Sequence, residues 1–78
     1  MRTPVTLPEL GASVSFGLWY VEVGEDVAEG DRLAEVLMEG ASIAVTAPAA
    51  GRLVERCAWP RDRLRPGQVL AIVEVQDA

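Results

Sequence analysis

The sequence contains neither histidine nor lysine, and it has a single cysteine, Cys57. Without an imidazole the chain has no Ser/His or Cys/His catalytic pair and no Cys/His metal cluster. One cysteine cannot form an internal disulfide, so nothing indicates an oxidising compartment. These absences exclude most nucleophilic catalysis and the common zinc sites.

Basic residues are also few, and long apolar segments are missing. Twelve Asp and Glu face 7 arginines in 78 residues, which argues against nucleic acid or an anionic membrane as the partner. No apolar run approaches membrane-spanning length and the sequence contains no secretory signal pattern, so we expect a cytoplasmic protein. Half of the residues are apolar, enough for one small core. We expect one domain over residues 1–76 and a tail at 77–78.

Cys57 lies between Arg56 and Ala58 in a strand-like run. One hypothesis is that nearby arginines lower the pKa of its thiol and produce a reactive thiolate. The alternative, which we favour, is a small buried apolar residue.

An internal repeat is the strongest sign of organisation. One set of residues recurs forty positions later: Val5, Thr6, Pro8 and Gly11 match Val45, Thr46, Pro48 and Gly51. A second set recurs thirty-seven positions later: Val27, Gly30, Leu33, Ala34 and Val36 match Leu64, Gly67, Leu70, Ala71 and Val73. The change of offset indicates three additional residues between Gly11 and Val27. Neither half can bury its own apolar face, so we expect the halves to pack on each other.

Alternating apolar residues and β-branched residues predict strands throughout, because Gly and Pro interrupt every candidate helix. The expected strands are Thr3–Leu7, Gly17–Glu22, Arg32–Leu37, Ala41–Thr46, Gly51–Ala58 and Val69–Val75, with short pieces at Asp26–Val27 and Arg63–Leu64. The sequence therefore predicts an all-β flattened barrel or sandwich of two roughly four-stranded sheets with pseudo-twofold symmetry.

Alternation predicts that Trp19, Val21 and Val23 point to one side of their strand, and Leu18 and Tyr20 to the other. Trp19 is expected to anchor the core. If Leu18 and Tyr20 face solvent, they form an apolar patch and a candidate contact surface.

Several motifs occur in a fixed order along the chain: Leu7–Gly11, Trp19, Val23–Val36, Ala47–Gly51 and Pro66–Ala71. Together they resemble the lipoyl/biotinyl-attachment domains, and most closely the lipoyl domains of the E2 acyltransferases of 2-oxo acid dehydrogenase complexes. The resemblance covers about residues 3–75. It implies a domain that carries lipoate or biotin on one lysine at a hairpin turn, serves as a substrate of other subunits, and is not itself a catalyst.

Gly40 stands where that lysine is expected. Lipoyl-type and biotin-type alignments both place Gly40 at the modified position, with Glu39 and Ala41 flanking it at the hairpin tip. The resemblance implies lipoate, yet this chain has no lysine to carry it, so we expect no cofactor. Glycine also suits a tight turn for backbone reasons alone. Backbone drift and a specific binding role for the tip are therefore both open.

Three further departures from the family pattern stand out. The loop from Gly11 to Gly17 is about three residues shorter than in typical lipoyl domains, where this loop lies beside the tip. Arg61 occupies the place of a turn glycine, and Arg56 that of an apolar strand residue. These departures indicate a surface released from the family's usual constraints.

The first hypothesis is a lipoyl-like domain without a modifiable lysine, acting as a non-acylated binding or scaffold module. Its partners would be proteins, either subunits of a dehydrogenase-type complex or the target of a stand-alone adaptor. The alternative is a lipoyl (acyl-carrier) domain of an E2 acyltransferase whose lysine was replaced by Gly40. A third hypothesis, an enzyme using Glu25 with Asp26 or using Glu39, is the weakest, because such carboxylates are more often solvated turn residues.

Overall fold

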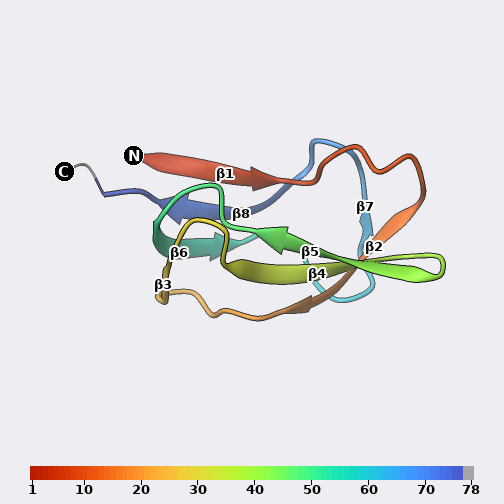
Figure 1. Cartoon of the computed structure of the whole chain (residues 1–78), viewed down its shortest axis with the longest axis horizontal. Helices are drawn as coiled ribbons and strands as arrows, with labels where there is room; N and C mark the ends of the chain where they lie inside the picture. The colour runs from red at the N-terminus through yellow and green to blue at the C-terminus, as the bar shows by residue number, and fades with distance from the viewer. Residues whose placement is uncertain (77–78) are drawn as a thin grey trace.

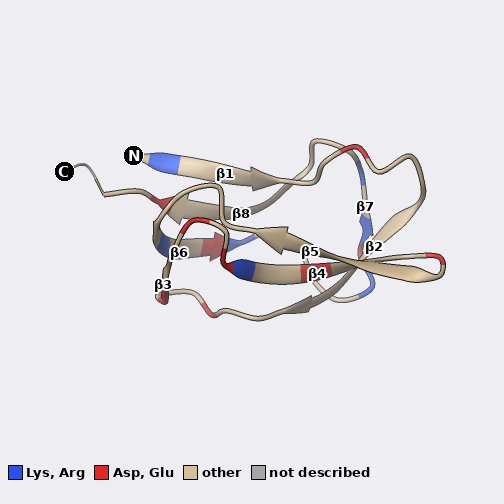
Figure 2. Ribbon diagram, in the orientation of Figure 1, with Lys and Arg blue, Asp and Glu red and all other residues tan. Residues whose placement is uncertain are grey.

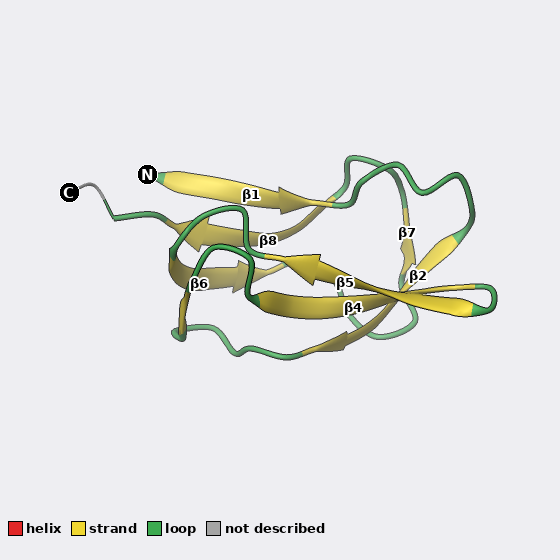
Figure 3. Ribbon diagram, in the orientation of Figure 1, coloured by secondary structure: helices red, strands yellow, loops and turns green. Residues whose placement is uncertain are grey.

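The computed structural model describes residues 1–76 and folds this range into eight β-strands without a helix (Figure 3). The strands are β1 Arg2–Thr6, β2 Val14–Trp19, β3 Asp26–Val27, β4 Arg32–Met38, β5 Ala41–Thr46, β6 Gly51–Arg56, β7 Arg63–Leu64 and β8 Val69–Glu74. The tail predicted at 77–78 lies outside the described residues.

The strands form two antiparallel sheets of four. Sheet A has the order β1-β8-β6-β3, and sheet B has the order β5-β4-β2-β7. Strands β1, β8, β6 and β3 of sheet A correspond in turn to β5, β4, β2 and β7 of sheet B, each four strands away in the sequence. A pseudo-twofold axis requires this correspondence. The N-terminus and the end of β8 lie at one end of the elongated molecule, and the β4–β5 hairpin extends at the other (Figure 1). The predicted fold class is confirmed.

Pairs of backbone hydrogen bonds between the halves show the symmetry in detail. The amide of Gly24 donates to the carbonyl of Leu53 (2.8 Å), and the amide of Arg61 donates to the carbonyl of Phe16 (2.9 Å). Both bulges also match, one between Phe16 and Leu18 and the other between Leu53 and Glu55. The offset is thirty-seven residues throughout this region.

This offset corrects one detail of the sequence repeat. Val14 begins β2 as Gly51 begins β6, so Val14, not Gly11, is the structural equivalent of Gly51. The three additional residues of the first half therefore lie in the β1–β2 loop, where Gly11 adopts a positive φ of 70°.

Strand β2 is displaced from its predicted range of Gly17–Glu22. It begins earlier because Val14 and Phe16 alternate into the core, and it ends at Trp19. A turn follows, in which the carboxylate of Glu25 accepts a hydrogen bond from the amide of Glu22 (2.8 Å). The predicted alternation therefore does not continue to Val23, which is 52% exposed.

The core lies between the two sheets and contains only apolar residues among those described. Its largest fully buried side chains are Phe16, Leu33, Leu53, Leu70, Val36 and Val73. Burial of each such side chain contributes about 1.5–3 kcal/mol relative to exposure. Because both halves supply these residues, neither half can retain the core alone.

Trp19 packs at the edge of this core and is half-buried, as expected for an anchor. Its ring lies 4.8 Å from that of Phe16, and its indole N–H donates to the carbonyl of Ala58 (2.9 Å). Arg56 is the two-fold equivalent of Trp19, and its guanidinium lies 5.8 Å and 5.7 Å from the rings of Trp19 and Trp59. The charged residue at an apolar strand position is thus accommodated by cation–π contacts.

Substitution of Gly51 tests how closely β6 approaches β8. A Cβ at this position would overlap the carbonyl of Glu74, and backbone cannot move as a flexible side chain can. We predict that Gly51→Ala lowers the free energy of unfolding by about 1–3 kcal/mol in urea denaturation. Ala12→Ser, which adds one atom to an exposed loop residue, should change it by less than about 0.5 kcal/mol. Equal stability of the two variants would contradict this packing.

Candidate functional site

The candidate site is the tip of the β4–β5 hairpin, residues Met38–Ala41. Met38 and Ala41 are paired, so Glu39 and Gly40 form a two-residue turn. The predicted site residues Glu39, Gly40 and Ala41 are all exposed there. The structure thus brings the three together at the extreme end of the molecule (Figure 1).

Gly40 has a φ of 79°, whereas Glu39 does not have a positive φ. Positive φ at the second central residue alone is the pattern of a type II turn, which favours glycine at that position. No atom lies within 4 Å of a Cβ built on Gly40. A side chain at this position would therefore project freely into solvent, and its only obstacle would be the strain of the backbone.

The β1–β2 loop, residues 7–13, lies at the same end as the tip. Its residue Leu10 lines a small apolar pocket of about 240 Å³ together with Ile43 of β5. Its residue Ser13 lines a second, larger groove together with Glu39. The loop and the tip are therefore neighbours, as expected from the family resemblance.

The larger groove, hereafter the β7 groove, has a volume of about 690 Å³. Its lining includes Ser13, Ser15, Leu37, Glu39, Arg63 and Arg65. Apart from Glu39, these residues were not recognised as a candidate site from the sequence, because no motif contains them. Knowledge of the cross-strand register would have identified them, since Ser15 pairs with Leu37 on one side and with Arg63 on the other.

The outer face of sheet B carries an apolar patch next to this groove. Leu18 is 43% exposed, Leu37 44% and Tyr20 49%, so Leu18 and Tyr20 do face solvent. The hydroxyl of Tyr20 donates to Glu35 Oε2 (3.1 Å). Hydrogen bonds from Ser42 and then Tyr20 lower the pKa of Glu35, and the bond to Glu35 raises the pKa of Tyr20. Glu35 thus accepts the hydrogen bond of the Tyr20 hydroxyl as a carboxylate.

The hypothesis of an activated Cys57 is wrong. The residue is half-buried, and desolvation followed by the charge of Glu55 raises the pKa of its thiol. Cys57 is therefore a protonated thiol at neutral pH.

The remaining candidate carboxylates have local structural roles. Glu25 caps the turn after β2, and Asp26 forms an ion pair with Arg52 (3.3 Å). Among residues 1–76, no three or more His, Cys, Asp and Glu side chains are grouped so that they could hold a metal ion. That same range contains no helix long and apolar enough to cross a membrane.

The chain matches the biotinyl/lipoyl family model, described as biotin-requiring enzyme, over residues 3–73. It is 32% identical over 77 residues to the lipoamide acyltransferase component of the branched-chain alpha-keto acid dehydrogenase complex of Pseudomonas aeruginosa. It is 34% identical over 77 residues to the dihydrolipoyllysine-residue succinyltransferase component of the 2-oxoglutarate dehydrogenase complex of Bartonella vinsonii. Each alignment covers 95% of this chain but only 18% and 19% of the relative. The chain thus spans less than a fifth of the length of these relatives.

Solved structures show the same fold. The lipoyl domain of the 2-oxoglutarate dehydrogenase complex of Azotobacter vinelandii superimposes with a TM-score of 0.70 at 21% identity, covering 99% of this chain and 96% of that domain. The urea carboxylase of Kluyveromyces lactis contains a similar domain, with a TM-score of 0.85 at 16% identity over 95% of this chain and 6% of that chain. This chain therefore belongs to the biotinyl/lipoyl domain family and is related to the E2 acyltransferase components of 2-oxo acid dehydrogenase complexes.

Proposed function

We propose that this chain is a lipoyl-like domain that works without an attached prosthetic group, as a protein-binding module. One observation carries the proposal: Gly40 occupies the exposed tip, and the sequence contains no lysine at any position. Attachment of lipoate or biotin requires the amine of a lysine side chain. The residues at the tip therefore do not fit either group.

The rest of the scaffold supports a retained binding role. Both sheets, the core and the hairpin are complete. A turn that carries no prosthetic group does not itself require this intact scaffold. The tip, the adjacent loop and the β7 groove all lie at one end of the molecule. We place the partner at this end, and we propose a subunit of a dehydrogenase-type complex or a related protein.

The second candidate is the acyl-carrier domain of an E2-type acyltransferase in which glycine replaces the lysine at position 40. The open space around Gly40 supports it, because a Cβ at this position would have no other atom within 4 Å. Both candidates assign Gly40 to the attachment position. They differ in whether the unmodified domain is the working form.

The mass of the domain tests the proposal directly. We predict that the chain, expressed together with a lipoate ligase and a biotin ligase, has the mass of the unmodified polypeptide in electrospray mass spectrometry. A lipoyl domain that carries its lysine, expressed in parallel, provides the positive control. An added lipoyl or biotinyl mass on this chain would refute the proposal.

The assignment of Gly40 to the attachment position is tested by Gly40→Lys. We predict that lipoate ligase modifies this variant, since the new side chain projects freely from the tip. The positive φ of 79° should lower the free energy of unfolding by about 1 kcal/mol. Gly30→Lys is the matched control, because Gly30 also has a positive φ and open space but lies in another turn. Modification of both variants, or of neither, would contradict the assignment.

A further inference from the structure

The pseudo-twofold axis places two equivalent rows of side chains on the outer faces of the two sheets. On sheet A, the paired residues Arg2, Glu74, Arg52 and Asp26 form one row across β1, β8, β6 and β3. On sheet B, the equivalent row is Ser42, Leu37, Ser15 and Arg63 across β5, β4, β2 and β7. We call these the charged row and the Leu37 row. Directly paired residues share a face, so each row is continuous.

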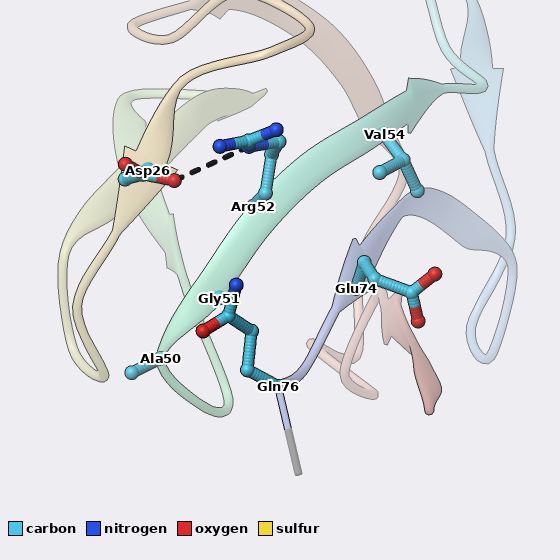
Figure 4. Close-up of a pocket in the computed structure, with 7 residues that line it drawn as sticks. All are labelled: Asp26, Ala50, Gly51, Arg52, Val54, Glu74 and Gln76. Carbon is cyan, nitrogen blue, oxygen red and sulfur yellow. Dashed lines mark hydrogen bonds and ion pairs between the residues drawn. The ribbon is translucent and has the colours of Figure 1, made fainter. Parts of the chain in front are cut away.

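The charged row neutralises itself. Its charges alternate in sign, with Arg2 Nε 3.6 Å from Glu74 Oε1 and Arg52 Nε 3.3 Å from Asp26 Oδ1. Figure 4 shows Arg52 reaching Asp26 in the groove of about 600 Å³ that this row lines. Every charge in this row therefore has a neighbour of opposite sign within the molecule.

The Leu37 row has lost all but one of these charges. Arg63 stands where the charged row has Asp26, but its paired neighbour is Ser15 instead of an ion of opposite charge. Leu37, which is 44% exposed, stands where the charged row has Glu74. No carboxylate oxygen of residues 1–76 lies within 4 Å of the guanidinium of Arg63 or Arg65.

The surrounding charges strengthen this difference. Figure 2 shows acidic residues around β3, at the end with the termini, and arginines at β7, nearer the tip. Arg61, Arg63 and Arg65 occupy the positions equivalent to Gly24, Asp26 and Ala28. A protein with an excess of acidic residues thus carries neighbouring arginines beside an exposed leucine, in a groove whose lining also includes Glu39 of the tip.

We propose that the β7 groove is a docking site for an acidic, leucine-containing segment of a partner protein. Its carboxylates would pair with Arg63 and Arg65, and its apolar side chain would cover Leu37. Charge complementarity favours this occupant. In the equivalent groove of sheet A, the carboxylates of Asp26 and Glu74 pair with arginines of the same chain, whereas Arg63 and Arg65 would pair with carboxylates of the partner. This proposal rests on the binding role proposed above and names the chemistry of the partner.

The probe is a fluorescein-labelled peptide of alternating glutamate and leucine, with a glutamine–leucine peptide as the uncharged control. We expect the wild-type chain to bind only the glutamate peptide at low ionic strength, and to bind it more weakly as salt is added. Arg63→Gln combined with Arg65→Gln should weaken binding about tenfold by fluorescence anisotropy. The matched control, Arg2→Gln with Arg52→Gln, makes the same change in net charge on the other sheet and should alter binding less than about twofold.

Leu37→Glu provides a second, independent variant. This substitution places a glutamate at the position equivalent to Glu74 of the charged row. The sheet should therefore tolerate the glutamate, and the circular dichroism spectrum should be unchanged. We expect this variant to lose binding of the glutamate peptide. In the wild type, amide chemical shifts of Ser15, Leu37 and Arg63 should move on titration, while those of the charged row should not.

Equal loss of binding in both arginine pairs would overturn the proposal, since the attraction would then depend only on net charge. Failure of the wild type to bind the peptide would also overturn it, yet would leave the mass measurement on the bare domain unaffected. Sedimentation equilibrium tests whether a second copy of this chain occupies the groove. Self-association that disappears with Arg63→Gln and Arg65→Gln would assign the groove to a second copy of this chain and overturn the proposal of a separate partner.

Discussion

The structure depends on the reciprocal contact between two half-domains. The amides of Gly24 and Arg61 bind the carbonyls of Leu53 and Phe16 across the axis, and the side chains of Phe16 and Leu53 are themselves buried in the shared core. Each half thus completes the hydrogen bonding and the burial of the other, which explains why the turns recur at equivalent positions. The β4–β5 tip lies outside these contacts, so its sequence can change without loss of the fold.

Symmetry also provides an internal reference for function. Where the halves agree, the shared residues serve folding, as the matched bulges in β2 and β6 illustrate. Where the halves differ, the requirements of the shared fold do not explain the difference. The charged row and the Leu37 row have the same backbone pairing, but only the first is electrically satisfied. The two rows therefore differ in charge at equivalent positions, and the Leu37 row lies beside the tip that lacks a lysine.

The sequence was sufficient for the fold because its signals were local and repeated. Turn glycines and alternating apolar residues predicted the bounds of β5, β3 and β7 as they are observed. Strand β2 was misplaced because the bulge at Gly17 interrupts the alternation on which the prediction relied. Motif spacing predicted a hairpin turn at Gly40, and the structure has that turn. The Leu37 row was not predicted, because its members come from four strands and meet only through cross-strand register. The pKa of Cys57 likewise depends on burial and on Glu55, not on the arginine next to it in sequence.

We propose that the unmodified domain is the working form. The most direct test is mass spectrometry of the tryptic peptide Leu33–Arg52, which contains the tip, from the protein purified out of its own host as a native complex. We expect the protein to retain its partner until digestion, and this peptide to have the mass of the unmodified sequence with glycine at position 40. A lysine at that position carrying a lipoyl or biotinyl group would contradict the account.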